Sequence, residues 1–279
     1  MSKTYVLFII KILEIRGKRD MKKLLYFAFF SFFAFFGTVN CETETLNWIV
    51  DGQTYTTTTC ESGGDVILPP TPTKPGYTFV GWEHYTPVEY LTSTGTQYID
   101  TGYVPKIGTK MEVRVKILND SGNKAYASLA SVAVGGSSYF SALLVSSGRC
   151  VGYAGGWFVT ISCNTNDIVT GSIDIGNGSA QIVQYNETKD NTVNYTRSVM
   201  FTPSLSVPLF AEAGDNGVAT YGIASMYYAK IWEWGELIHN YIPIIDINGT
   251  PCMYDTVTSE YLYNSGTGDF VAGPVISGE

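Results

Sequence analysis

PTKPGYTFVGW, residues 72–82, decides how the first part of this chain folds. The two prolines at its start cannot join the hydrogen bonding of a central strand, so they mark a connection that leads into one. The aromatic and β-branched residues that follow favour a strand. In strict alternation Tyr77 and Phe79 share one face, and a bulge at Gly81 would return Trp82 to that face. We predict that these three rings form the core of a small module, because so short a module has few other apolar contacts.

The residues before this stretch continue the pattern. LNWIV (46–50) leads into Asp51-Gly52, a strong signal for a two-residue hairpin. QTYTTTTC (53–60) is rich in residues that favour strands. These segments predict short strands joined by tight turns, with no helix of useful length.

The WIVDG opening, the GGDVILPPTP turn and the closing PTKPGYTFVGW resemble the small β-grasp repeat of bacterial surface proteins, the B-repeat of the internalin type. The resemblance covers about residues 46–82, and we expect the module to occupy residues 44–83. It implies a spacer or presentation unit. In that family the repeat is often in tandem, whereas this chain has a single copy.

The composition favours an all-β protein. Gly (29) and Tyr (20) are abundant among the 279 residues; glycine marks turns and aromatic residues favour strands. After the first module, short strand-like segments are separated by turn residues at a spacing that predicts a β-sandwich. The predicted strands are 109–118, 125–134, 139–146, 156–162, 167–175, 180–186, 191–197, 207–213, 225–232 and 237–245.

Both ends of this second region carry a further resemblance. EYLTSTGTQYIDTGY (89–103) at the start, with YIPI (241–244) and YNSGTGDFVAGP (263–274) at the end, is similar to concanavalin/laminin-G-like jelly-roll domains of secreted bacterial or phage-associated proteins. The match covers about residues 88–274, and we expect the domain to span residues 88–276. The resemblance implies that the first and last strands of the domain pair. The predicted fold is therefore a small β-grasp-like module followed by a jelly-roll β-sandwich.

Charge is distributed unevenly along the chain. The formal net charge is −8, but residues 1–40 hold seven of the 17 Lys and Arg and only two acidic residues. The remaining 10 basic and 23 acidic residues give a net charge of −13. Because phosphate binding needs clustered Lys and Arg, this composition argues against nucleic acid and anionic lipid as partners.

The basic start of the chain is typical of an export signal. Met21-Lys22-Lys23 precedes the apolar run LLYFAFFSFFAFF (24–36), which has the length of a secretory h-region and is too short to span a membrane. We predict a signal peptide at residues 21–43 after an upstream extension at residues 1–20. Cleavage, lipid attachment at Cys41 and an uncleaved anchor stay open. The predicted location is extracellular or at the cell surface, with membrane contact only through this segment.

Export bears on the remaining cysteines, Cys60, Cys150, Cys163 and Cys252. In an oxidising compartment they could form disulfides, with Cys150 and Cys163 closing a short loop. Buried free thiols are the equal alternative. With two histidines in the chain and no C-x-x-C motif, a zinc site has few ligands to use.

The sequence predicts no catalytic residues. Glycoside hydrolysis uses two suitably spaced carboxylates. GSIDIGNG (171–178) offers only Asp174, and EWGE (233–236) places Glu233 and Glu236 around a turn. His239 in LIHNYIPI is expected to face inward as a structural residue. We predict no cofactor. Calcium is the metal that the jelly-roll resemblance makes most credible, and it stays open, because acids lie in turn-like segments but no ligand set can be named. Those acids are Asp100, Asp215, Asp246 and Asp255.

Sugar binding uses exposed aromatic rings, and three residues are candidates. Trp234 lies in the predicted hairpin turn Glu233-Trp234-Gly235-Glu236, where it has no evident core role. Tyr153 and Trp157 lie beside the glycines of GYAGGWF. We predict an exported, non-catalytic binding or adhesion protein at the cell surface or secreted, with carbohydrate as the favoured ligand class and a host or cell-surface protein as the other partner. The alternatives are a purely structural presentation module and a divergent glycoside hydrolase.

Overall fold

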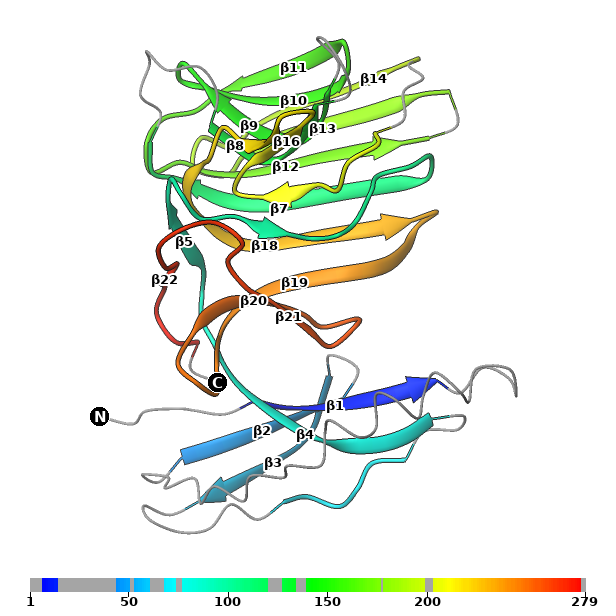
Figure 1. Cartoon of the computed structure of the whole chain (residues 1–279), viewed down its shortest axis with the longest axis vertical. Coiled ribbons are helices and arrows are strands. Elements are labelled where there is room, and N and C mark those ends of the chain that lie inside the picture. Colours follow the sequence, from blue (N-terminus) through cyan, green and yellow to red (C-terminus); the bar gives the residue numbers. More distant parts are fainter. Residues whose placement is uncertain are drawn as a thin grey trace. The chain divides into compact units, whose positions relative to one another are not determined.

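The structure, a computed structural model, describes residues 7–14, 44–50, 53–60, 68–73, 77–119, 127–133, 139–176, 178–198 and 203–276. Strands are its regular elements, and no helix occurs within these residues (Figure 1). It follows that none of the described residues belongs to an apolar helix of membrane-spanning length. The all-β prediction is confirmed, and the antiparallel sheets are consistent with a β-sandwich. The chain divides into two compact units, Met1–Thr86 with Ile276–Glu279, and Pro87–Val275.

The first unit is a sheet with the strand order β4-β1-β2-β3. β1 runs parallel to β2 and antiparallel to β4, whereas β2 and β3 form an antiparallel hairpin. Val50 lies opposite Gln53, so the predicted pairing of the two strands is confirmed. The strands are β1 (Leu7–Glu14), β2 (Glu44–Val50), β3 (Gln53–Cys60) and β4 (Tyr77–Pro87).

Trp48 is a fully buried residue of this unit, and its indole Nε1 donates to Thr58 Oγ1 at 2.8 Å. The strand predicted from YTFVGW is present as the start of β4. The side chains of Tyr77, Phe79 and Trp82 lie outside the described residues, so their burial stays a prediction.

The predicted signal peptide, residues 21–43, lies outside the described residues. β1 falls within the predicted upstream extension, residues 1–20. The start of the second unit at Pro87 lies next to the predicted boundary of the jelly-roll domain.

The larger sheet of the second unit is antiparallel, with β7 and β18 at its centre. β12, β13 and β14 follow β7, while β19, β20 and β21 follow β18. The unit's first strand, β5, pairs with its last, β22, as the jelly-roll resemblance implied. The strands are β5 (Leu91–Thr94), β7 (Thr109–Ile117), β12 (Ile168–Ile175), β13 (Ala180–Asn186), β14 (Asn191–Arg197), β18 (Ile223–Glu233), β19 (Glu236–Asp246), β20 (Pro251–Asp255), β21 (Glu260–Leu262) and β22 (Val271–Ala272).

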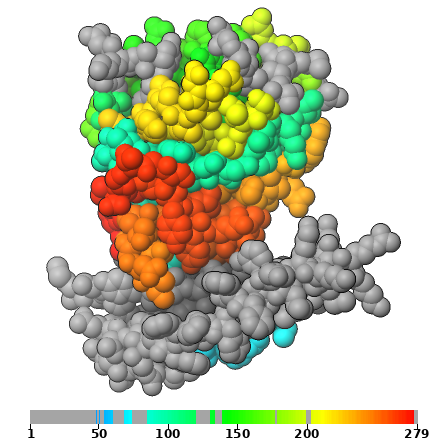
Figure 2. Space-filling view, in the orientation of Figure 1, coloured from blue at the N-terminus to red at the C-terminus, as the bar shows by residue number. Residues whose placement is uncertain are grey.

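The smaller sheet has the order β11-β10-β9-β8-β15-β6, with β16 and β17 joined to it through β8. The segment of β15, β16 and β17, coloured yellow, forms a continuous part of the visible surface of this unit (Figure 2). The strands are β6 (Ile99–Asp100), β8 (Ala127–Ala133), β9 (Tyr139–Ser146), β10 (Arg149–Gly155), β11 (Trp157–Ser162), β15 (Pro208–Leu209), β16 (Glu212–Gly214) and β17 (Gly217–Ala219).

The apolar core lies between these two sheets. Strict alternation in β7 buries every second residue, because successive side chains of a strand point to opposite faces. The side chains between them point away from the core, and we call that side the outer face of the larger sheet. The buried residues of β7 are Thr109, Met111, Val113, Val115 and Ile117, and those on the outer face are Lys110, Glu112, Arg114 and Lys116.

β10 is a strand that the predicted list omitted, because RCVGYAG is rich in glycine and glycine is depleted in strands. Its conformation depends on a close contact in the core. A Cβ on Gly152 would lie 2.4 Å from Ile182 Cγ2 and 2.7 Å from Gln184 Nε2. Glycine is therefore required where β10 of one sheet approaches β13 of the other.

The cysteines of the second unit are buried free thiols. Cys150, Cys163 and Cys252 are all without a disulfide and fully buried. The sequence left disulfides and buried free thiols as equal alternatives, and in the structure these three cysteines are free thiols. The side chain of Cys60 lies outside the described residues.

Candidate functional site

The β18–β19 hairpin ends in the predicted turn. Glu233 lies opposite Glu236, and the two residues between them both have positive φ, 51° at Trp234 and 87° at Gly235. Positive φ at both central positions defines a type I′ turn, which normally holds Asn, Asp or Gly. A bulky residue in this conformation is uncommon and costs stability. Trp234 thus occupies the tip against the local preference of the backbone.

Trp234 is exposed and yet fixed in place. Its side chain is 71% exposed. The Trp234 amide donates to the carbonyl of Gly108 at 2.8 Å, and a Cβ on Gly108 would lie 2.4–2.7 Å from Cε2, Cδ2 and Nε1 of the indole. These three atoms are bonded neighbours in the middle of the ring system, so Gly108 lies against the face of the indole. The ring is therefore held on one side and open to solvent on the other.

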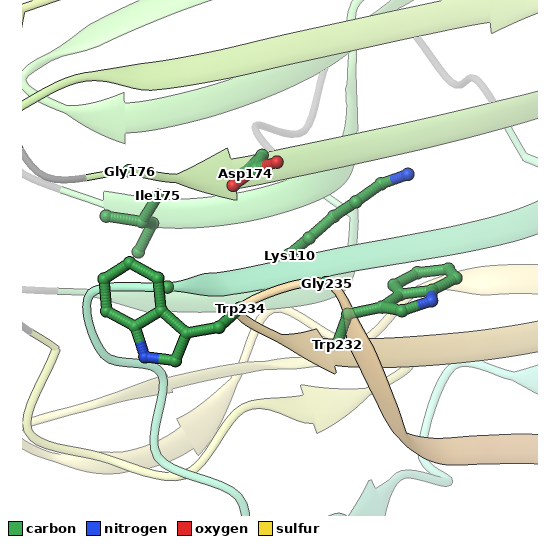
Figure 3. Close-up of a pocket in the computed structure, with 8 residues that line it drawn as sticks. Lys110, Asp174, Ile175, Gly176, Trp232, Trp234 and Gly235 are labelled. Atoms are coloured by element: carbon green, nitrogen blue, oxygen red, sulfur yellow. The ribbon is translucent and has the colours of Figure 1, made fainter.

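A pocket of about 450 Å³ lies beside this indole (Figure 3). The hairpin contributes two tryptophans, β7 contributes a lysine, and the end of β12 contributes an aspartate. Figure 3 shows Asp174 and Ile175 on the side of the pocket opposite the two indoles. The residues that line it are Gly108, Lys110, Asp174, Ile175, Gly176, Trp232, Trp234 and Gly235.

Three of these residues form one row across the outer face of the larger sheet. Asp174 of β12 pairs with Lys110 of β7, which pairs in turn with Trp232 of β18. Lys110 Nζ lies 4.6 Å from the centroid of the Trp232 ring, within reach of a cation–π interaction. The same ammonium is 3.7 Å from Glu112 Oε2. The row places a donor, an acceptor and an aromatic ring side by side.

Asp174 is the acceptor in this row. Its carboxylate has no hydrogen-bond donor among the residues that the structure describes. Partial burial raises the pKa of Asp174, and the nearby Lys110 opposes that rise. A ligand that donates hydrogen bonds here would satisfy a carboxylate that accepts none from the described residues.

The base of the hairpin is held by a polar cluster. Glu233 Oε1 accepts from Lys106 Nζ at 2.8 Å and from the hydroxyl of Tyr103 at 3.0 Å. The bond from Lys106 lowers the pKa of Glu233. Burial is the main reason why the pKa of Tyr103 rises to about 12, so its hydroxyl remains a donor. These contacts anchor the strand that leads into Trp234.

The other two predicted residues lie elsewhere. Tyr153 and Trp157 are on β10 and β11 of the smaller sheet, and neither lines the pocket. Trp157 packs on Tyr195 of β14, with ring centroids 4.9 Å apart, and also contacts the core. Tyr153 pairs with Phe158, with ring centroids 5.2 Å apart. The structure does not bring these two residues together with Trp234.

His239 lies on the inward side beside Tyr241, as predicted. The two rings stack with centroids 5.4 Å apart, and His239 Nδ1 lies 2.6 Å from Asp255 Oδ2. Burial alone would raise the pKa of Asp255, but this contact and three further hydrogen bonds lower it.

Three of the four acids considered for calcium, Asp100, Asp246 and Asp255, accept hydrogen bonds within the protein. Asp246 accepts from the amides of Asn248 and Thr250, and Asp100 accepts from the amide of Gly102. Such bonds close turns. Within the described ranges no three His, Cys, Asp or Glu side chains group as metal ligands would. The absence of a cofactor stays a prediction, and calcium stays the open alternative.

Lys110 and Trp232 were missed as site residues, and Asp174 was considered only as a catalytic carboxylate. In the sequence, Lys110 and Trp232 are ordinary members of two alternating strands, and Asp174 lies near the end of a third. Trp232 and Trp234 are two residues apart, so alternation along the strand predicts that they lie on the same side of one hairpin. That spacing is the signal that could have found Trp232. Strand register, which no local pattern specifies, then brings Lys110 and Asp174 beside them.

Comparison with known proteins identifies one part of the chain. The family model of the Listeria-Bacteroides repeat domain matches residues 45–101. This supports the predicted surface repeat and extends beyond it, through β5 to β6. No curated protein matches the chain.

Among solved structures, the enzymatically active domain of bacteriophage CBA120 tailspike protein 2 aligns with 55% of this chain at 11% identity and a TM-score of 0.33. The aligned part spans a quarter of that tailspike chain. The jelly-roll topology stays a prediction.

Proposed function

We propose that this chain is an exported, non-catalytic binding or adhesion protein of the bacterial surface, and that the second unit binds carbohydrate in the Trp234 pocket. The match to the Listeria-Bacteroides repeat domain supports the surface assignment. The apolar segment at residues 24–36 supports export. In this proposal the second unit binds the ligand, and the repeat presents the second unit at the surface.

The observation that carries the proposal is the fixed, exposed indole of Trp234. A tryptophan that is 71% exposed, in a backbone conformation that disfavours it, costs stability without adding to the core. One face of its ring is packed on Gly108. The remaining face is a rigid apolar platform whose ordering cost is already met before a ligand arrives.

The chemistry around this platform fits a sugar. The C–H face of a pyranose ring can cover the open face of Trp234, as apolar surface packs on an aromatic ring. The ring's hydroxyl groups can then donate to the free carboxylate of Asp174 and accept from Lys110. A pocket with a few polar groups beside an apolar wall is the usual form of a small-ligand site.

The non-catalytic part of the proposal rests on the carboxylates. Hydrolysis of a glycosidic bond uses a pair of carboxyl groups that flank the bond. Among the residues that line the pocket, Asp174 supplies the single carboxylate. One acceptor is sufficient to orient a bound sugar but does not form such a pair.

A glycan array followed by calorimetry with the best glycan tests the proposal. We expect Trp234→Ala to weaken binding by about 30-fold, the effect of losing a contact worth about 2 kcal/mol. Phe158→Ala is the matched control, because Phe158 is an exposed ring (51%) on the smaller sheet; it should bind like the parent protein. Failure to bind any glycan would favour a purely structural presentation module. Cleavage of a bound glycan would favour a glycoside hydrolase.

A further inference from the structure

The outer face of the larger sheet continues the pocket along the strands. In the next row, Ser172 of β12 pairs with Glu112 of β7, which pairs with Lys230 of β18. The row after it consists of Thr170, Arg114 and Tyr228 on the same three strands. The pocket row and these two rows form one surface, on which Ser172 is buried and the other side chains are partly buried. We call it the three-row face.

Two aromatic side chains mark the ends of this face on β18. Trp232 and Tyr228 have the same parity and are four residues apart, so about 13 Å separates them at the rise of an extended strand. No register shift interrupts the pairing of β18 with β7 between them. Lys230 lies between them, with Nζ 4.6 Å from the centroid of the Tyr228 ring. The spacing exceeds the length of one pyranose ring.

The side chains of the far row are fixed by one another. Tyr228 donates its hydroxyl to Glu112 Oε1 at 3.0 Å. Arg114 binds Glu187 through two hydrogen bonds of 2.8 and 2.7 Å, and Thr170 donates to the same carboxylate at 2.9 Å. Burial, reinforced by Glu112, raises the pKa of Tyr228 to about 12. The far row is therefore organised in advance, as the pocket is.

The charge of this face differs from that of the chain. Its basic residues are Lys110, Arg114 and Lys230, three of the 10 basic residues after residue 40. Its acidic residues are Asp174 and Glu112, and Glu187 binds Arg114 beside it. The face is thus close to neutral in a chain that is otherwise strongly acidic, and donors alternate with acceptors along it. Such a surface matches the hydroxyl groups of a neutral glycan better than a polyanion.

We propose that the ligand is a linear, neutral glycan chain that runs from the Trp234 pocket along β18 to Tyr228, so that several consecutive sugar units are bound. This inference rests on the proposed function and specifies its ligand class. The pocket holds one unit against Trp234. The second and third rows bind the following units through Lys230, Glu112 and the ring of Tyr228.

Calorimetry with neutral oligosaccharides of glucose, mannose and xylose, from the monosaccharide to the hexasaccharide, tests this proposal. We expect affinity to rise at least about tenfold with length in one series, since each tenfold step corresponds to about 1.4 kcal/mol of added contact. Tyr228→Ala and Lys230→Ala should both lower the ratio of hexasaccharide to monosaccharide affinity. Tyr195→Ala, at an exposed ring on β14 of the same sheet, is the matched control and should leave the ratio unchanged.

The outcomes separate this inference from the function on which it rests. Binding that depends on Trp234 but does not increase with length overturns the extended site and leaves the sugar pocket intact. An unchanged ratio in both Tyr228→Ala and Lys230→Ala also overturns it. Absence of binding to every member of the three series overturns the extended site, and the glycan array then decides on the pocket itself.

Discussion

The indole of Trp234 lies on the Cα of Gly108, and the amide of Trp234 donates to the carbonyl of Gly108 at 2.8 Å. This contact joins the tip of the β18–β19 hairpin to the start of β7. It allows an exposed tryptophan to keep one orientation. A side chain at position 108 would occupy the place of the ring.

Gly108→Ala is therefore expected to displace the Trp234 ring and weaken glycan binding about as strongly as Trp234→Ala does, by roughly 30-fold. The matched control is Gly217→Ala, at the start of β17 and away from the pocket. Both glycines have positive φ, so alanine strains the backbone at each, but a Cβ at Gly217 meets no atom within 4 Å. Gly217→Ala should lose stability with a much smaller loss of binding. Equal losses of binding in the two variants would mean that strain, and not the contact with the ring, is responsible.

Asp174 should make glycan binding depend on pH. Burial raises its pKa above the usual 3.8, so its ionised fraction falls as the pH is lowered from neutrality toward that raised value. Sugar hydroxyls donate to the ionised form, and the affinity should fall along with it. Calorimetry over a pH series should show this fall in the parent protein and a flat profile in Asp174→Asn.

The same substitution has an opposite effect on stability. A raised pKa means that the ionised carboxylate is less favourable in the folded chain than in the unfolded chain at neutral pH. Asp174→Asn should therefore unfold at the same or a higher temperature than the parent protein while it binds glycan more weakly. A loss of both stability and binding would indicate a structural role for Asp174.

Asp255 is expected to be essential for the stability of the second unit. It is fully buried and accepts bonds from His239 Nδ1 at 2.6 Å, from two backbone amides and from Thr258 Oγ1. Asp255→Ala should cost about 3–5 kcal/mol, because it leaves these donors without their acceptor. Denaturant unfolding measures the loss. Asp215→Ala, at an exposed position in the turn between β16 and β17, is the control and should lie close to the parent protein.

The lowered pKa of Asp255 also predicts how the stability of the protein changes at acidic pH. Its folded value is lowered, so its contribution to stability is complete above the ordinary pKa of 3.8 and is lost as the pH falls through the lowered value. The parent protein should lose stability over that acidic range. Asp255→Ala should lose less over the same range, since the titrating group is absent. Parallel curves for the two proteins would contradict this assignment.

Much of the fold follows from local patterns. Alternation and turn residues predicted all-β structure, the pairing of β2 with β3 and the hairpin tip at Trp234, because each of these depends on neighbours in sequence. β10 was missed because its Gly152 is required by Ile182 of another strand, which no local pattern reveals. Whether a glycine belongs to a strand can thus depend on the side chain that it meets across the core.

The site divides in the same way. The sequence by itself determined that a tryptophan would stand at an exposed turn, since a two-residue hairpin leaves its central side chains outside the ladder. Only the tertiary structure decided that Gly108 would hold this ring, and that Lys110 and Asp174 would lie beside it. These residues come from strands far apart in the chain, and their meeting depends on the register of β12, β7 and β18. Register is set by which faces are buried together, a property of the whole sheet.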